Sequence, residues 1–148
     1  MLKHIGFTGT SQGMSLPQRI EIQRMFANIP GMYPEMEVIF HHGDCVGADE
    51  EAHHIALVNG MKIHLHPPEN SKSRAFCTPN WTAEEKPYLE RNKDIVRASS
   101  LMFATPKEYE EVLRSGTWST VRFARKIGVR VCIVLPDGSR KIEGNKNV

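Results

Sequence analysis

The chain has 148 residues, of which 40% are hydrophobic and 24% are charged. These values are typical of one globular domain, and a formal net charge of +2 does not by itself predict a polyanionic partner. The three cysteines, Cys45, Cys77 and Cys132, form no CxxC pair, so we expect free thiols in a reducing cytoplasm. Neither a signal-peptide apolar region nor a run of about 18 apolar residues occurs, which predicts a cytoplasmic protein that does not span a membrane.

Apolar runs alternate with helix-like stretches along the chain. The first strand is predicted over 3–8, and Pro17 suits the first turn of a helix whose Ile22 and Phe26 share one face. The Pro30-Gly31 pair is expected to end that helix. Further strands are predicted over 37–41, 62–66, 100–104 and 130–135, and further helices over 49–59, 87–98 and 117–127, with a short helix over 107–113.

Two segments lack a periodic pattern. The stretch 69–85 follows Pro68 and contains Pro79, and a loop of this length in a compact domain is usually functional or mobile. Its Phe76 and Trp81 could stack on a base or close over a ligand, or they could simply anchor the loop by their burial. The last residues are polar, and we expect them to be frayed.

The order of elements predicts the fold. Strands that alternate with helices imply right-handed crossovers, so we expect an α/β fold: a three-layer Rossmann-like domain with a mostly parallel five-stranded sheet. This domain is predicted over 1–138, followed by a polar C-terminal tail over 139–148. No Gly-Lys-Ser/Thr follows a glycine turn, which excludes a P-loop, and the first turn does not match the dinucleotide fingerprint GxGxxG.

Three strands run into turns rich in Gly, Ser, Thr or Asp that are followed by helices, at 8–13, 43–49 and 115–120. In a parallel sheet these turns meet at one edge, where free N–H groups and helix N-termini bind anions such as phosphate. Each glycine alone could merely form its turn, and Asp49 could merely cap its helix. Three equivalent turns favour a shared ligand crevice.

A helical stretch over 88–96 places Arg91 beside two further polar residues, Asn92 and Lys93. The Arg91 guanidinium could hold a phosphate or carboxylate. Alternatively, this stretch is a solvated helix face on which Glu90 and Asp94 pair with the basic groups.

Six of the seven histidines lie between His41 and His66. His64 and His66 share one face of their predicted strand, because side chains alternate along a strand. A metal could draw on histidines from several elements, but no acidic or cysteine partner has ligand-like spacing and no HExxH occurs. We therefore expect no metal site, and histidines that form hydrogen bonds near the crevice or are exposed.

The motifs taken in order resemble the SLOG superfamily of nucleotide-binding domains, over residues 5–136. Residues 43–57 are similar to the GxAxGxDxxAHxxAL segment of DprA/Smf proteins, and residues 88–96 to their FxxRNRxI segment. Residues 115–136 resemble their SGSxxTxxxA…VxxxPG ending. The superfamily also includes the LOG nucleotide phosphoribohydrolases, whose PGGxGTxxE motif ends in a catalytic glutamate. Thr120 stands at that position here.

The resemblance implies a ligand site built from the three turns, often in a homo-oligomer. With Asp44 and Ala48 from the second turn added, the candidate ligand or phosphate-binding residues are Gly9, Thr10, Ser11, Gly43, Asp44, Gly47, Ala48, Asp49, Arg91, Asn92, Ser115, Gly116, Thr117 and Thr120.

The first function that we predict is binding of a nucleotide or nucleotide-derived molecule, with no separate cofactor. The second is cleavage of an N-glycosidic bond, for which Asp44, Asp49 and Glu50 are the candidate catalytic carboxylates. The third is DprA-like binding of single-stranded DNA in a basic groove, and the residues predicted to line that groove are Arg91, Lys93, Arg122 and Arg125.

Overall fold

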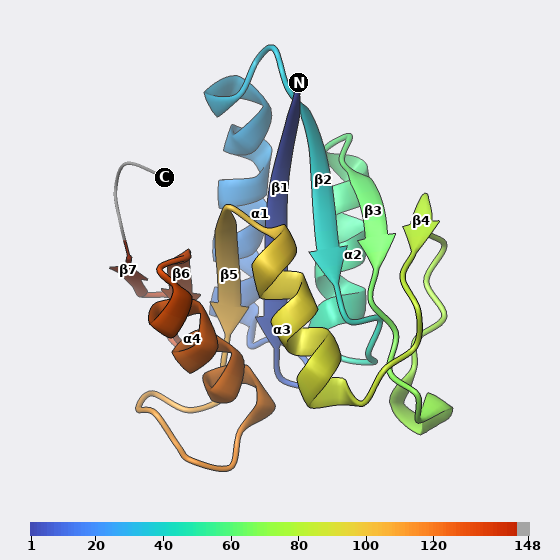
Figure 1. Cartoon of the computed structure of the whole chain (residues 1–148). Helices are drawn as coiled ribbons and strands as arrows, with labels where there is room; N and C mark the ends of the chain where they lie inside the picture. Colours follow the sequence, from blue (N-terminus) through green and yellow to red (C-terminus); the bar gives the residue numbers. More distant parts are fainter. Residues whose placement is uncertain (145–148) are drawn as a thin grey trace.

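The centre of the molecule is a seven-stranded sheet with strand order β4-β3-β2-β1-β5-β6-β7 (Figure 1). The computed structural model describes residues 1–144. Its strands are β1 (Leu2–Gly9), β2 (Glu37–His42), β3 (Lys62–Leu65), β4 (Trp81–Thr82), β5 (Leu101–Thr105), β6 (Arg130–Val134) and β7 (Arg140–Glu143). Its α-helices are α1 (Leu16–Met32), α2 (Ala48–Val58), α3 (Tyr88–Ala98) and α4 (Gly116–Ile127).

The order of the strands reverses at the middle of the sheet. From β1 the chain adds β2, β3 and β4 on one side, then returns through α3 to place β5 on the other side of β1. All strand pairs are parallel except β6 with β7. The crevice beyond the carboxyl ends of β1 and β5 is therefore the topological switch point, where open α/β sheets bind their ligands.

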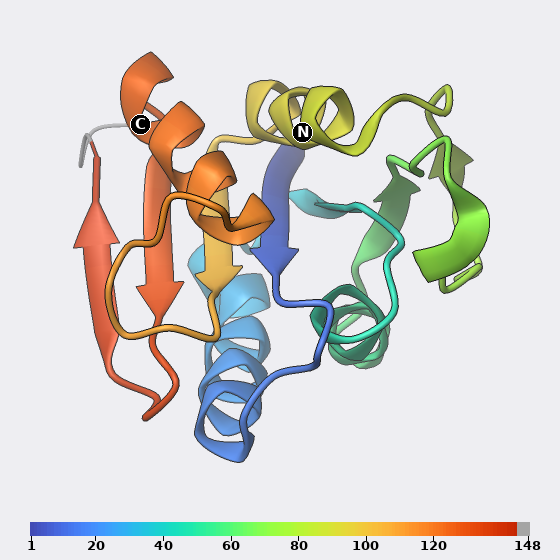
Figure 2. The same ribbon diagram turned by 90° about the horizontal axis from the view of Figure 1, so that it is seen from below.

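Two helices cover each face of the sheet, and Figure 2 shows the three layers from below. On one face, α1 and α2 pack on alternate residues of the strands, including Phe7, Phe40 and Ile63. On the other face, α3 and α4 pack on Met102 and Ile133. The two faces bury different residues because side chains alternate along each strand.

The α/β class and the three-layer architecture are confirmed, but the predicted count of five strands is wrong. Strand β4 lies in the stretch 69–85 that was predicted to be a loop, and it pairs with β3 in parallel. Strand β7 lies in the polar segment that was expected to be frayed, and it pairs with β6. Neither strand has an apolar alternation, since both lie at the sheet edges and are largely exposed. The end of the predicted tail, 145–148, lies outside the described residues.

Two helix predictions also need correction. The stretch 107–113 forms bends and turns instead of a short helix. Helix α1 continues through Pro30 to Met32 instead of ending at the Pro30-Gly31 pair. Its start agrees with the sequence, because Ser15 and Gln18 form a reciprocal capping box around Pro17. In the described part of the chain, no helix combines the length and the apolar character that crossing a membrane requires.

Candidate functional site

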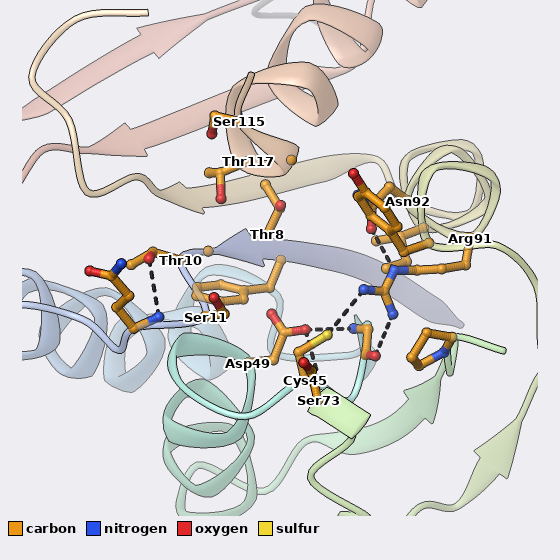
Figure 3. Close-up of a pocket in the computed structure, with 18 of the residues that line it drawn as sticks. Thr8, Thr10, Ser11, Cys45, Asp49, Ser73, Arg91, Asn92, Ser115 and Thr117 are labelled. Atoms are coloured by element: carbon orange, nitrogen blue, oxygen red, sulfur yellow. Dashed lines mark hydrogen bonds between the residues drawn. The ribbon is translucent and has the colours of Figure 1, made fainter. Parts of the chain in front are cut away.

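A pocket of about 460 Å³ lies at the carboxyl edge of the sheet, at the switch point between β1 and β5 (Figure 3). Ten of the fourteen predicted ligand-binding residues line it: Gly9, Thr10, Ser11, Gly43, Asp49, Arg91, Asn92, Ser115, Gly116 and Thr117. The three turns, far apart in the sequence, therefore meet around one cavity. Its volume is within the usual range for small-molecule sites.

The second turn, 43–49, is held by hydrogen bonds within itself. The Asp49 carboxylate accepts through Oδ2 from the Gly43 N–H at 3.1 Å and from the Cys45 N–H at 3.3 Å. Gly47 has φ of +91°, and a Cβ atom there would lie 2.3 Å from the Ser11 carbonyl oxygen. Gly47 is needed because the first and second turns pack backbone against backbone at this point.

Asp44 points away from the pocket, into the loop that follows β3. Its fully buried carboxylate accepts from Arg74 Nε at 2.8 Å and from the Cys77 N–H at 2.9 Å. The same loop contributes the Ser73 carbonyl, which accepts from the Val46 N–H at 2.8 Å. Asp44 thus ties the second turn to this loop and, in this structure, is not available as a catalytic or ligand-binding carboxylate.

Three further candidates, from the second turn and the start of helix α2, do not line the cavity. Gly47 is half-buried and Ala48 is buried, and the Ala48 N–H donates to the Thr10 carbonyl at 3.0 Å. Glu50 is on the first turn of α2 and does not line the pocket. The cavity therefore has one predicted catalytic carboxylate in its wall, Asp49.

Asp49 is a buried carboxyl group with 6% of its surface exposed. Burial raises its pKa from 3.8 to about 6, although Arg91 and the two backbone N–H groups favour the ionised form. Within the described residues both of these bonds are accepted by Oδ2, so Oδ1 is the oxygen available to a ligand. A carboxyl group with this pKa can both give and accept a proton near neutral pH.

Arg91 lies in the wall of the pocket and joins three elements. Its guanidinium donates to the carbonyl oxygens of Gly43 and His66, to Cys45 Sγ at 3.1 Å and to Asn92 Oδ1 at 2.6 Å. It is 6% exposed, so the alternative of a solvated helix face is wrong for this residue. Asp94, by contrast, pairs with Lys86 and Arg97 on the outside of α3.

The opposite wall is the start of helix α4. Ser115 caps the helix by accepting from the Trp118 N–H at 3.1 Å, and Gly116 and Thr117 line the cavity. The first N–H groups of a helix have no partner within the helix, and they face the cavity with a partial positive charge. In Figure 3, Asp49 lies across the cavity from Thr117.

Three solved structures share this architecture, whereas no family model and no curated protein matches the sequence. The molybdenum cofactor binding protein from Rippkaea orientalis superposes with a TM-score of 0.66 and 17% identity, over 91% of this chain and 77% of that one. The molybdenum cofactor carrier protein from Chlamydomonas reinhardtii gives 0.64 and 17%, over 90% and 76%. DNA processing protein A (DprA) from Streptococcus pneumoniae gives 0.66 and 18%, over 89% and 50%.

The chain has the fold of these structures. The resemblance seen in the three motifs is thereby confirmed at the level of fold, and the chain spans half the length of the Streptococcus DprA. Within this fold, Thr120 lies one turn into α4, outside the pocket between the turns. Its hydroxyl donates to the Gly116 carbonyl at 2.8 Å, so it stabilises the helix start instead of facing the cavity.

The pocket also contains residues that the sequence motifs did not reveal. Cys45, Tyr88, Lys107, Glu108 and Arg114 all line it, and the last three come from the connection between β5 and α4. Their positions follow from the path of that connection across the mouth of the site. A charged stretch just before the Ser115 cap was the available signal, since loops next to a capped helix often carry ligand contacts.

The four basic residues predicted to line a nucleic-acid groove differ in their surroundings, and Arg91 is buried. Arg122 pairs with Glu111, and Arg125 pairs with both Glu111 and Glu143. Lys93 lies over the ring of Phe123 at 5.7 Å from its centroid. Because Arg91 is buried and the others are paired or packed, these residues offer few free cations to a phosphate backbone.

Proposed function

We propose that this SLOG-type pocket binds a nucleotide or nucleotide-derived small molecule, with its phosphate at the start of helix α4. The observation that carries the proposal is the convergence of the Ser115–Thr117 helix start with basic side chains around one cavity. Arg91, Lys107 and Arg114 line the pocket against two acidic groups, Asp49 and Glu108. Free N–H groups and a surplus of cations together favour an anion.

The remainder of the pocket suits the rest of such a ligand. Tyr88 lies at the start of α3 and is 55% exposed, so its ring is available to stack on a base. Thr8, Thr10 and Asn92 supply hydroxyl and amide groups that can hydrogen-bond a sugar. Proteins described as binding or carrying the molybdenum cofactor share the fold, which supports a small organic ligand as the class of partner.

Calorimetry with adenosine monophosphate, ADP-ribose and the molybdenum cofactor tests the proposal, with adenosine and inorganic phosphate as the two halves of a nucleotide. We expect the phosphorylated forms to bind more tightly than adenosine. Arg114→Ala should weaken that binding about tenfold, since a charge-assisted contact is lost. Lys126→Ala, an exposed cation at the far end of α4, is the matched control. Absence of binding to every probe by the folded protein would reject the proposal.

Asp49 supports a second candidate function, hydrolysis of an N-glycosidic bond. Its carboxyl group lines the cavity with a pKa near 6, and Oδ1 is available to a sugar or a water. The test is release of free base from nucleoside monophosphates, followed by chromatography. Activity that disappears in Asp49→Asn, while nucleotide binding persists, would support hydrolysis. Unchanged nucleotide after prolonged incubation would leave binding alone as the function.

A further inference from the structure

Four histidines gather on the α3 side of the sheet, away from the pocket. His4 comes from β1, His41 from β2, and His64 and His66 from β3 and the residue after it. His41 and His64 are direct neighbours in the parallel register, and His64 and His66 alternate onto the same face. In Figure 1, α3 lies in front of β1 and next to β2, and β3 follows toward the sheet edge beside β4.

The rings are in mutual contact. His41 Nδ1 lies 2.9 Å from His66 Nε2, and His41 Nε2 lies 2.8 Å from His4 Nδ1. The His64 ring stacks on His41 and on His66, with centroid separations of 4.8 Å in both pairs. One nitrogen from each of His41, His64 and His66 lies within 4.8 Å of the other two. The cluster therefore brings three imidazole nitrogens close enough together to hold one ion.

We propose that His41, His64 and His66 form a site for a divalent transition-metal ion of the zinc type. This reverses the expectation of no metal that the sequence alone supported. Zinc binds imidazole nitrogens at about 2.0–2.1 Å, which puts the ligand atoms of a tetrahedral site about 3.3 Å apart. The His41 Nδ1–His66 Nε2 separation of 2.9 Å is close to this spacing, and all three ligand atoms lie within 4.8 Å of one another.

The hydrogen bonds assign roles within the cluster. A metal between His41 Nδ1 and His66 Nε2 leaves His41 Nε2 to donate to His4 Nδ1. Metal-bound histidines commonly donate their second N–H to such a partner, which orients the ring. His4 is therefore a positioning residue, and His64 completes the set of three ligands.

The protonation state of the rings suits metal binding. Burial, together with the neighbouring histidines, lowers the pKa of His41 to about 3 and the pKa of His66 to about 4. Burial also lowers the pKa of His64. The rings are thus neutral at physiological pH, and neutral imidazole is the form that binds metals. Three buried or half-buried rings of one kind need no counter-ion while they stay neutral.

The site has a route to solvent and a connection to the pocket. His64 is half-buried, and the partly exposed Trp81 on β4 lies beside it at 6.2 Å between ring centroids. Three protein ligands with an open fourth position are the pattern of catalytic or exchangeable zinc sites. The His66 carbonyl accepts from Arg91 at 3.0 Å, so a hydrogen bond joins a proposed metal ligand to the pocket wall.

A second group, His42, His53 and Cys77, lies on the opposite face and suits a metal less well. The Asp44 N–H donates to His42 Nδ1 at 3.0 Å, and His42 Nε2 lies 3.0 Å from His53 Nδ1. Because His42 Nδ1 accepts from a backbone N–H, the single proton of the neutral ring lies on Nε2, and His42 has no free lone pair for a metal. Burial and the neighbouring Asp44 raise the pKa of the Cys77 thiol to about 12, which disfavours the thiolate that metals bind.

Titration of the full chain with Co²⁺ and Zn²⁺ tests the proposal, using Co²⁺ absorption and elemental analysis after desalting. We expect one Co²⁺ per chain, with a ligand-field spectrum that lacks a thiolate-to-cobalt charge-transfer band. Co²⁺ should also quench Trp81 fluorescence. Trp81→Phe should remove that quenching while the stoichiometry stays at one.

Variants assign the ligands. His64→Ala, at the half-buried position, should weaken Co²⁺ affinity more than 100-fold, and His4→Ala about 10- to 100-fold, as expected for an outer partner. His54→Ala, which removes an exposed histidine on α2 outside both groups, should leave the affinity unchanged. Circular dichroism establishes that each variant is folded.

Two results would overturn the proposal. One is the absence of Co²⁺ and Zn²⁺ binding by the folded wild-type protein at micromolar concentrations. The other is a strong charge-transfer band that persists in His64→Ala and disappears in Cys77→Ser, which would place the metal on the opposite face. Neither result depends on whether the pocket binds a nucleotide, so the two proposals fail separately.

Discussion

The second and third turns of the pocket use similar residues in opposite ways. In the second turn, 43–49, the carboxylates are already hydrogen-bonded within the protein. Asp49 accepts from two backbone N–H groups of the turn, and Asp44 accepts from the Arg74 side chain and the Cys77 N–H. In the third turn, 115–120, Ser115 accepts from the Trp118 N–H and the Gly116 carbonyl accepts from the Thr120 hydroxyl, while Ser115, Gly116 and Thr117 line the cavity. The turn with the longest family motif is thus mainly a scaffold, and the shorter one is the better candidate for ligand contact.

Gly47→Ala should be the most damaging change, because it breaks the scaffold. The new Cβ would lie 2.3 Å from the Ser11 carbonyl oxygen, at a φ of +91°. We expect the free energy of unfolding to fall by about 3 kcal/mol or more, measured by urea denaturation. Gly31→Ala, in helix α1 with open space around it, is the control and should be neutral or slightly stabilising. Equal stability of the two variants would contradict a scaffold role for this turn.

Asp49→Asn should have a smaller, pH-dependent effect. Burial raises the pKa of Asp49 from 3.8 to about 6 in the folded state, so this group stabilises the fold most below about pH 4. Its contribution is lost as the pH rises through about 6, because ionisation then costs free energy in the folded state. Asp49→Asn should therefore raise the free energy of unfolding by about 2 kcal/mol at pH 8 and give no gain at pH 4.

Urea denaturation at the two pH values measures this effect, and Glu50→Gln removes the same charge from the adjacent residue outside the pocket. A gain at pH 8 of equal size in Glu50→Gln would point to a general charge effect. That result would contradict the prediction that ionisation of buried Asp49 destabilises the folded state.

Gly116→Ala should have the smallest effect on stability and the clearest effect on ligand binding. A Cβ there would have one neighbour within 4 Å, Tyr88 Cε2 at 3.7 Å, and it would begin a helix. We expect a change in unfolding free energy of less than about 0.5 kcal/mol, and about tenfold weaker nucleotide binding by calorimetry. Unchanged affinity would indicate that the phosphate of the ligand does not bind at the third turn.

The success of the sequence predictions depended on whether the signal was local. Apolar runs, the Ser15 cap and the glycine turns each act within a few residues, so most strands and helices were predicted correctly. Strands β4 and β7 were missed because they are short, polar edge strands that exist only through pairing with β3 and β6. Likewise Asp44 was predicted to face a ligand, and only the position of the loop carrying Arg74 turned it inward.

By itself, the sequence determined the α/β class, the three glycine turns and their assembly at one sheet edge, because parallel strands with crossovers leave few arrangements. The tertiary structure decided which turn is filled by its own hydrogen bonds and which residues of the β5–α4 connection complete the pocket. It also decided that His4, His41, His64 and His66 meet. Alternation along one strand is a local property, whereas the register between neighbouring strands is set only when the sheet assembles.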